Sequence, residues 1–207
     1  KSSLVRALAG VWLPARGAVR LDGATLDQWP TDELGKHIGY LPQDVQLFDG
    51  TIAQNIARFD PDTSSDMVLA AAKAAGVHDL VVHLADGYDT RVGEAGASLS
   101  AGQRQRIALA RSLYGDPFMV ILDEPNSNLD SEGEVALSAA IQGIRDRGGI
   151  VIVVAHRSTV LANVDTVLVM ANGHVQAFGP KDEVLNKVFR TAAPLKVVAA
   201  TERGVPA

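Results

Sequence analysis

Two continuous apolar runs constrain the fold of this chain more than any other feature. They are FMVILD at residues 118–123 and IVIVVAH at residues 150–156, and a helical pattern at residues 134–147 lies between them. Runs that are apolar throughout are typical of strands buried on both faces of a parallel sheet. Strands that alternate with helices predict an α/β fold with a mostly parallel sheet.

The composition fits this class and argues against several others. Of the 207 residues, 47% are hydrophobic and 21% are charged, which is ordinary for a globular domain. The absence of cysteine excludes disulfides and thiolate metal sites. A net charge of -5 argues against a nucleic-acid partner, because duplex binders present a basic face. The longest apolar run, residues 150–155, is far shorter than the roughly 20 residues of a membrane-spanning helix.

A helix-rich stretch interrupts the alternation, and we expect it to form an inserted helical lobe at about residues 52–118. In its last helix Ile107, Ala110 and Leu113 share one face, so we expect an amphipathic helix with its arginines elsewhere. The predicted elements from this part of the chain are a strand at 37–41, helices at 51–58 and 65–75, a loop at 86–98 and the long helix after LSAGQ at 99–103.

The two ends of the chain carry simpler patterns. Asn172-Gly173 is the strongest hairpin signal in the sequence. We expect a disordered tail at residues 191–207. The predicted elements are a helix within 1–13 that Gly10 ends or weakens, a strand at 18–21, strands at 166–170 and 174–177, and a helix at 181–188.

Candidate catalytic side chains end the two apolar runs. Asp123 and Glu124 close the first run, and His156 closes the second. Ligands of open parallel sheets bind at the carboxyl ends of the strands. There Asp123 can hold Mg²⁺, Glu124 can polarise a water, and His156 can hydrogen-bond a γ-phosphate. Taken singly, each feature also fits a structural role, as a solvated acidic pair or a structural histidine.

Two further segments offer groups for phosphate. Lys1-Ser2, followed by a helical pattern, fits the end of a phosphate-binding loop, in which the lysine contacts phosphates and the serine contacts Mg²⁺. In LSAGQ, Ser100 and Gly102 stand just before a long helix, whose N-terminus attracts anions. An ordinary helix N-cap would explain Ser100, but not the Leu, Gly and Gln around it.

These segments together resemble the nucleotide-binding domain of ABC ATPases over about residues 1–190. LSAGQ is similar to the ABC signature LSGGQ, with Ala101 in place of the first Gly, and the order and spacing of the other motifs also fit. The matching segments are Lys1-Ser2 (end of Walker A), Gln43 (Q-loop), VILDEP at 120–125 (Walker B), NSNLD at 126–130 (D-loop) and His156 (switch histidine).

The resemblance implies a P-loop NTPase (RecA-like) fold that lacks its N-terminal strands, with ATP and Mg²⁺ as cofactors. Two such domains are expected to pack head to tail, so that residues 100–103 reach the nucleotide bound by the partner. The implied catalytic residues are Glu124, His156 and Gln43, and the implied metal ligands are Ser2, Gln43 and Asp123. The implied nucleotide-binding residues are Lys1, Ser2, Ser3, Ser100, Ala101, Gly102, Gln103 and Asp130.

Two segments narrow the resemblance to exporters. LFDGTI at 47–52 with Asn55-Ile56 is similar to an exporter pattern, and so is VGEAG at 92–96. The motif set looks most like type I secretion exporters of the protease and lipase class. This resemblance implies ATP hydrolysis coupled to protein export at the cytoplasmic face of a bacterial inner membrane. The implied partners are the exporter's transmembrane domains, a second nucleotide-binding domain, and membrane fusion and outer-membrane components.

Two alternatives stay open. A soluble ABC ATPase acting on DNA or ribosomes would share the ATP motifs, although the acidic charge and LFDGTI favour the exporter. A non-catalytic truncated module is the other, because the glycines of the phosphate loop are not in the sequence. For the same reason we expect these 207 residues alone to bind ATP weakly or not at all.

Overall fold

The computed structural model describes residues 1–155 and 162–191, which fall into two compact units. The first unit comprises Lys1–Asn163, and the second begins at Val164. The predicted domain boundary at residue 190 stays a prediction, and the predicted tail lies almost wholly outside the described residues. Among the described residues, no helix is long and apolar enough to cross a membrane.

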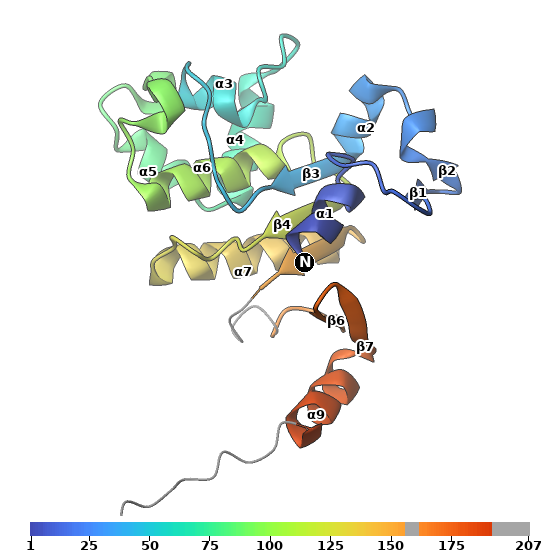
Figure 1. The fold of residues 1–207 in the computed structure, drawn as a ribbon. Helices are drawn as coiled ribbons and strands as arrows, with labels where there is room; N and C mark the ends of the chain where they lie inside the picture. The colour runs from blue at the N-terminus through green and yellow to red at the C-terminus, as the bar shows by residue number, and fades with distance from the viewer. Residues whose placement is uncertain (156–161, 192–207) are drawn as a thin grey trace, which may run out of the picture. The chain divides into compact units, whose positions relative to one another are not determined.

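A parallel sheet forms the centre of the first unit (Figure 1). Its strand order is β3 (Ile38–Leu41), β4 (Met119–Asp123), β5 (Ile150–Val154). The register places Leu41 beside Leu122 and Asp123 beside Val154, so all the carboxyl ends meet at one edge. The predicted α/β class with a parallel sheet is confirmed.

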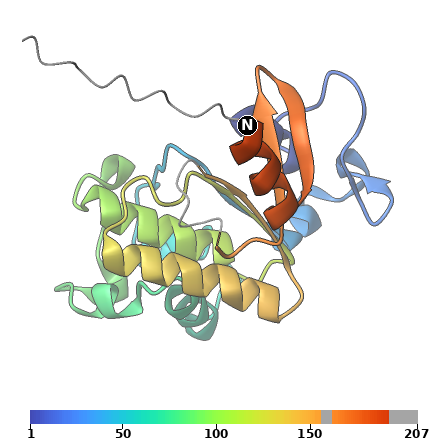
Figure 2. The same ribbon diagram turned by 90° about the horizontal axis from the view of Figure 1, so that it is seen from below.

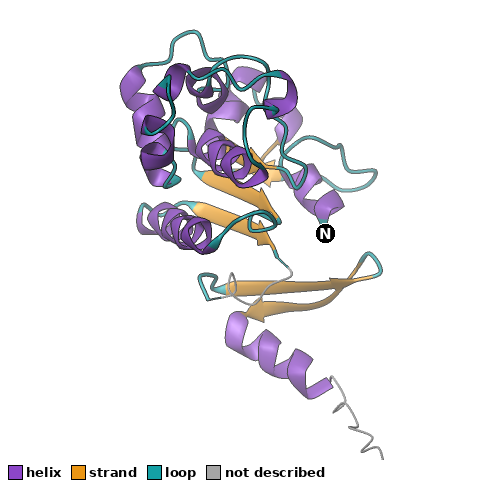
Figure 3. Cartoon of the chain, turned by 90° about the vertical axis from the view of Figure 1, so that its left-hand side faces the viewer, coloured by secondary structure: helices purple, strands orange, loops and turns teal. Residues whose placement is uncertain are grey.

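Alternating side chains divide this sheet between two cores. Leu41, Val120 and Leu122 face the larger core, which includes residues of α6 (Ala101–Leu113) and α7 (Ser131–Asp146). Ile121 and Val154 face a smaller core with Val5 of α1 (Ser2–Leu8). Helices therefore lie on both faces of the sheet, as in other α/β folds (Figure 3).

Helices fill the connection between β3 and β4. Thr51 and Ser64 each cap a helix by accepting a hydrogen bond from a backbone N–H, which starts these helices where the sequence predicts. The lobe lies at one end of the unit, and the N-terminal hairpin with α2 lies at the other (Figures 1 and 2). The elements of this connection are α3 (Ile52–Ile56), α4 (Ser65–Ala74), α5 (His78–Val82), two 3₁₀ turns, η2 (Gly87–Asp89) and η3 (Glu94–Gly96), and α6.

The prediction that α6 is amphipathic is wrong. It is buried around most of its circumference, and Gln105 and Arg106 are buried with the apolar residues. The reason is its central position, because α6 contacts α3, α4 and strand β3. The approach to β3 is so close that a Cβ at Gly39 would collide with the Ser112 carbonyl oxygen.

Strand β5 corrects a second prediction. The sequence predicts a strand buried on both faces, but only Val154 is buried and Ile150 is 46% exposed. Among the described residues β5 pairs with β4 alone and forms an edge of the sheet. An apolar run predicts a strand, but it does not predict how many neighbouring strands pair with it.

The N-terminal region holds short elements. Helix α1 ends at Leu8, and Gly10 follows with a φ of 75° that a helix does not allow. The predicted strand at 18–21 is reduced to β1 (Arg20–Leu21), which pairs with β2 (Ala24–Thr25) across Asp22-Gly23. The 3₁₀ turn η1 (Leu26–Gln28) and helix α2 (Thr31–His37) follow. Helix α2 was missed, and it takes up the first residue of the predicted strand 37–41.

The second unit is a hairpin followed by a helix. Strands β6 (Thr166–Ala171) and β7 (His174–Pro180) are antiparallel, and Asn172 and Gly173 take the positive φ angles of the turn. Helix α9 (Lys181–Thr191) packs on both strands. The predicted hairpin and closing helix are confirmed.

Candidate active site

The carboxyl edge of the sheet brings Ser2 and Asp123 together. The Ser2 hydroxyl donates a hydrogen bond of 3.2 Å to Oδ1 of Asp123. Packing sets this geometry, because Val5 anchors α1 on the sheet and Asp123 is the last residue of β4. The Asp123 side chain is fully buried, and its Oδ2 has no hydrogen-bond partner among the residues that the structure describes.

An unpartnered buried carboxylate oxygen is costly unless something else satisfies it. A cation bound next to Ser2 and Asp123 would do so. A hydroxyl and one carboxylate are typical ligands of Mg²⁺, which takes its remaining ligands from water and substrate phosphates. The described residues contain no cluster of three or more His, Cys, Asp or Glu side chains that could hold a metal. The Ser2 hydroxyl and the Asp123 carboxylate fit Mg²⁺ that takes its other ligands from phosphate and water.

Glu124 and Gln43 form a second pair at the same edge. Nε2 of Gln43 donates to Oε2 of Glu124 over 3.3 Å, and Gln43 comes two residues after the end of β3. Glu124 has a φ of 52°, and its N–H donates to the Val154 carbonyl of the neighbouring strand. A non-glycine residue in this region is unusual and is often found at functional sites. The backbone thus leaves the line of β4 at the residue predicted to activate water.

The LSAGQ segment forms the start of α6. Ser100 accepts from the Gln103 N–H at 3.2 Å, and the Gln103 side chain accepts from the Ser100 N–H at 2.9 Å. This reciprocal pair is a capping box, so Ser100 does have the N-cap role that was weighed against phosphate binding. A Cβ at Gly102 would lie 3.1 Å from the Asn128 carbonyl oxygen, so Gly allows close packing there. Ala101 is exposed.

Asp130 serves two structural partners. Its Oδ1 accepts from the Gly133 N–H at 2.8 Å, which caps α7, and from Arg106 at 2.6 Å. The Gly133 N–H, and after it the Arg106 guanidinium, hold the pKa of the Asp130 carboxyl below its usual value. Its predicted contact with nucleotide stays a prediction.

The structure therefore brings four of the predicted residues together in two pairs, Ser2–Asp123 and Gln43–Glu124. Lys1 and Ser3 lie exposed at the start of α1, and Ser100 and Gln103 bond to each other. His156 lies outside the described residues. Nucleotide and metal binding by all of these residues stay predictions.

Asn55 is a buried polar residue whose role the sequence did not reveal. Its side chain exchanges two hydrogen bonds of 2.9 Å with the backbone of Phe48 and donates a third to the Thr51 carbonyl. These bonds hold the LFDGTI segment in shape, which gives a structural reason for Asn in the pattern. A bridge between Thr51 and Arg91, and a hydrogen bond of 3.0 Å from the Val92 N–H to the Gly50 carbonyl, join this segment to VGEAG. The two exporter-like segments are thus one substructure.

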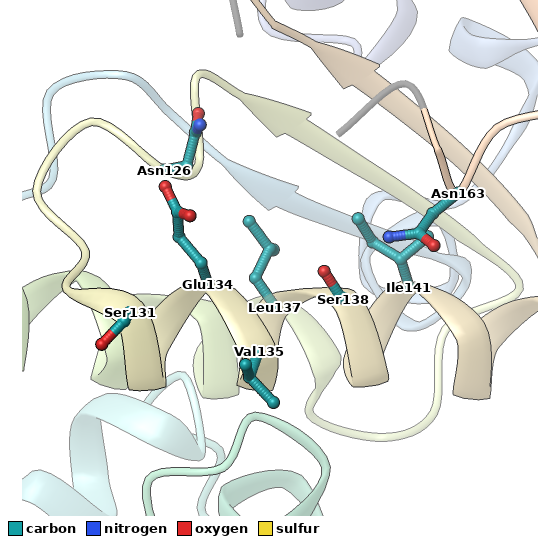
Figure 4. Close-up of a pocket in the computed structure, with 8 residues that line it drawn as sticks. All are labelled: Asn126, Ser131, Glu134, Val135, Leu137, Ser138, Ile141 and Asn163. Atoms are coloured by element: carbon teal, nitrogen blue, oxygen red, sulfur yellow. The ribbon is translucent and has the colours of Figure 1, made fainter. Parts of the chain in front are cut away.

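A cavity of about 310 Å³ lies along α7 (Figure 4). Side chains of α7 line most of it, together with Asn126 and Asn163. None of the residues predicted to bind nucleotide lines this cavity. This cavity is therefore not where the nucleotide chemistry is expected.

Comparisons with known proteins identify the family. The sequence profile of the family described as ABC transporter matches residues 1–127. The type I secretion system ATP-binding protein PrsD of Rhizobium meliloti (strain 1021) is 65% identical over 96% of the chain. The toxin RTX-III translocation ATP-binding protein of Actinobacillus pleuropneumoniae is 42% identical over 89% of the chain.

The fold is also similar to a solved structure, a bacterial Atm1-family ABC exporter with ATP bound. That match has a TM-score of 0.82 and 34% identity, and it covers 90% of this chain. The chain spans only part of each of these proteins. It covers 35% of PrsD, 26% of the RTX-III protein and 33% of the solved exporter chain.

Proposed function

This chain belongs to the ABC transporter family, and from that premise we propose that it is the ATP-binding and ATP-hydrolysing domain of an exporter. Its fold is that of an ABC ATPase, with a parallel sheet and a helical lobe. The observation that carries the proposal is the meeting of Ser2 with Asp123 and of Gln43 with Glu124 at the carboxyl edge of the sheet.

Ser2 and Asp123 would hold Mg²⁺ with the phosphates of ATP. The bound cation would neutralise charge that develops on the transferring phosphoryl group. Asp123 supplies the negative charge and an oxygen that needs a partner, and Ser2 supplies a hydroxyl whose direction the Asp123 carboxylate fixes. The free protein would thus already hold both ligands in place, which lowers the entropy that binding must overcome.

Glu124 would act on the attacking water. Its carboxylate accepts a hydrogen bond from Gln43, which orients one of its oxygens. A general base must lie within hydrogen-bond reach of the proton it takes. Because Glu124 directly follows Asp123, the base and the cation would act on the same phosphoryl group.

Residues 100–103 would act on the nucleotide of a second domain. They lie at the positive end of α6, a helix of 13 residues, and Ser100 and Ala101 are exposed. Two domains packed head to tail would each place this helix end on the γ-phosphate held by the other. ATP would then close the pair and hydrolysis would open it, as in other nucleotide switches.

Protein secretion is the transport process we propose. The support is the 65% identity to PrsD, a type I secretion ATP-binding protein, and the 42% identity to a toxin translocation protein. Further support comes from the joined LFDGTI and VGEAG segments, which we propose contact the exporter's transmembrane domains at the cytoplasmic face of the membrane. Membrane fusion and outer-membrane components would complete the export path.

Loss of the gene is expected to remove specific proteins from the culture medium and to retain them in the cells. Comparison of the secreted proteins of wild-type and deletion strains by mass spectrometry measures this. The wild-type gene should restore secretion, and a Glu124→Gln gene expressed at the same level should not. An unchanged set of secreted proteins, with altered export of a small molecule, would contradict protein secretion but not the exporter.

Replacement of Ser100 by Asn separates its cap role from a role in phosphate binding. Asn is as good an N-cap as Ser, so the thermal midpoint should change little. If the Ser100 hydroxyl reaches a phosphate, ATP hydrolysis by the intact protein should fall by about tenfold, the loss of one charge-assisted hydrogen bond. Ser64→Asn is the matched control, because Ser64 caps α4 in the same way outside the site. Wild-type turnover in both variants would leave Ser100 with the cap role alone.

A further inference from the structure

The three methionines of the chain differ in their exposure to solvent. Met67, in the first turn of α4, is 39% exposed, whereas Met119 is 6% exposed and Met170 is half-buried. A methionine thioether is oxidised to the sulfoxide most readily where an oxidant can reach it. Exposure therefore makes Met67 the most susceptible of the three.

The sulfur atom of Met67 contacts a buried hydroxyl group. Its Sδ lies 3.9 Å from Oη of Tyr114, which is within the reach of a hydrogen bond to sulfur, and Tyr114 is only 5% exposed. The same Oη lies 3.1 Å from Oδ2 of Asp60 and 2.8 Å from Oγ1 of Thr63. Burial raises the pKa of the Tyr114 phenol, so the hydroxyl keeps its proton at neutral pH.

The Tyr114 hydroxyl has one proton to donate, and its neighbours compete for that proton. The Asp60 carboxylate is the strongest acceptor because it is charged, and the Met67 thioether is the weakest. Tyr114 therefore donates to Asp60 while Met67 is reduced. A sulfoxide carries a polar oxygen on the same sulfur, so oxidation would place a strong acceptor beside the hydroxyl.

The bond between Asp60 and Tyr114 ties the loop between α3 and α4 to the end of α6. Tyr114 is the first residue after α6. The same loop carries Arg58, whose guanidinium donates to the Arg111 carbonyl at 2.9 Å and to the Ser112 carbonyl at 3.3 Å. These carbonyls lie in the last turn of α6, where a helix has no partners of its own for them. A change at Tyr114 would thus act on the attachment of this loop to α6.

We propose that Met67 is an oxidation site, at which a peroxide forms the sulfoxide and thereby breaks the hydrogen bond between Asp60 and Tyr114. With hydrogen peroxide, the sulfur lone pair forms the S–O bond as the O–O bond breaks, and the departing oxygen takes up the proton and leaves as water. Sulfur is oxidised by two electrons and the peroxide is reduced by two. Methionine sulfoxide reductases reverse this oxidation. The chemistry requires neither a nucleotide nor a second domain.

Treatment of the intact protein with hydrogen peroxide tests the site. Peptide mass spectrometry should show that Met67 gains one oxygen at least about tenfold faster than Met119. Hydrogen–deuterium exchange should show that amides of residues 58–67 exchange about tenfold faster after oxidation, because a hydrogen bond to a charged group is lost. Incubation with methionine sulfoxide reductases A and B should restore slow exchange.

Two variants separate the Met67 sulfoxide from other effects of peroxide. Met67→Leu is the matched control, because leucine is similar in size and has no sulfur. Exchange in this variant should not change on treatment. Tyr114→Phe removes the hydroxyl, so exchange should be fast before treatment and should not rise further with it, as expected when two changes act on one bond.

Three results would overturn the oxidation site or its effect. Equal rates of oxidation at Met67 and Met119 would remove the assignment of the site. A Met67 sulfoxide with unchanged exchange would show that the bond between Asp60 and Tyr114 does not respond to oxidation. An equal rise of exchange in Met67→Leu would assign the effect to another group. The proposed ATPase function would stand in all three cases, because none of these measurements depends on ATP.

Discussion

Replacing Glu124 by Gln is expected to lower the rate of ATP hydrolysis by at least about 100-fold while ATP binding is retained. The amide has nearly the shape of the carboxylate, and its oxygen can still accept from Gln43, so the local geometry should persist. It cannot take a proton from water at neutral pH. Only the step that needs a base is removed, so kcat should fall without a matching rise in KM.

The same variant should collect in the ATP-bound paired state, because hydrolysis is the step that opens the pair. Phosphate release measures the loss of turnover. Size-exclusion chromatography, or cross-linking with ATP and with ADP, measures the trapped pair. Glu183→Gln makes the same change at an exposed position of α9 and should behave as wild type. Sustained phosphate release by Glu124→Gln would show that another group activates the water.

The position of Asp123 and Glu124 at the sheet edge was predictable from strand direction, because two apolar runs separated by a helix predict parallel strands whose carboxyl ends meet at one edge. Gln43 was assigned to the same site only through the family resemblance, and Ser2 through its likeness to the end of a phosphate-binding loop. Helix starts and turns were equally predictable where a single residue type determines them. Ser100 starts α6, and Asn172-Gly173 turns the hairpin, for reasons contained in a few neighbouring residues.

The burial of a side chain was predictable only where the spacing of apolar residues along the sequence indicates a buried face. Arg106 was placed away from the apolar face of α6, yet it is buried, because its partner Asp130 is 24 residues away in the sequence. Asn55 looked like part of a motif, and its three backbone bonds became visible only in the folded loop. Helix α2 was missed although Asp32 and Glu33 mark its first turn, since Gly35 in its middle weakens the helical signal. Long-range pairing is therefore where the sequence alone was insufficient.

Replacing Asp123 by Asn is expected to reduce Mg²⁺-dependent ATP hydrolysis by about 100-fold or more, comparable to the loss of other transition-state electrostatic contacts. The change removes the negative charge that would hold the cation. It also places an N–H₂ group where Oδ2 now lies without a partner, or directs it at the Ser2 hydroxyl. Titration of hydrolysis with Mg²⁺ at fixed ATP should show a much higher half-saturating Mg²⁺ concentration.

The stability of the Asp123→Asn variant should change much less than its activity. The buried Oδ2 accepts no hydrogen bond from the described part of the chain, so its loss should not destabilise the fold, and the thermal midpoint should stay within about 2 °C of wild type or rise. Asp60→Asn is the matched control, because Asp60 accepts hydrogen bonds from Tyr114 and from the Asp62 N–H. The Asp60 variant should lose stability and keep its dependence on Mg²⁺. A lowered midpoint with an unchanged Mg²⁺ titration for Asp123→Asn would make Asp123 a structural residue. An unchanged or raised midpoint with a shifted Mg²⁺ titration would mean that the fold keeps the buried Asp123 carboxylate because the reaction requires it.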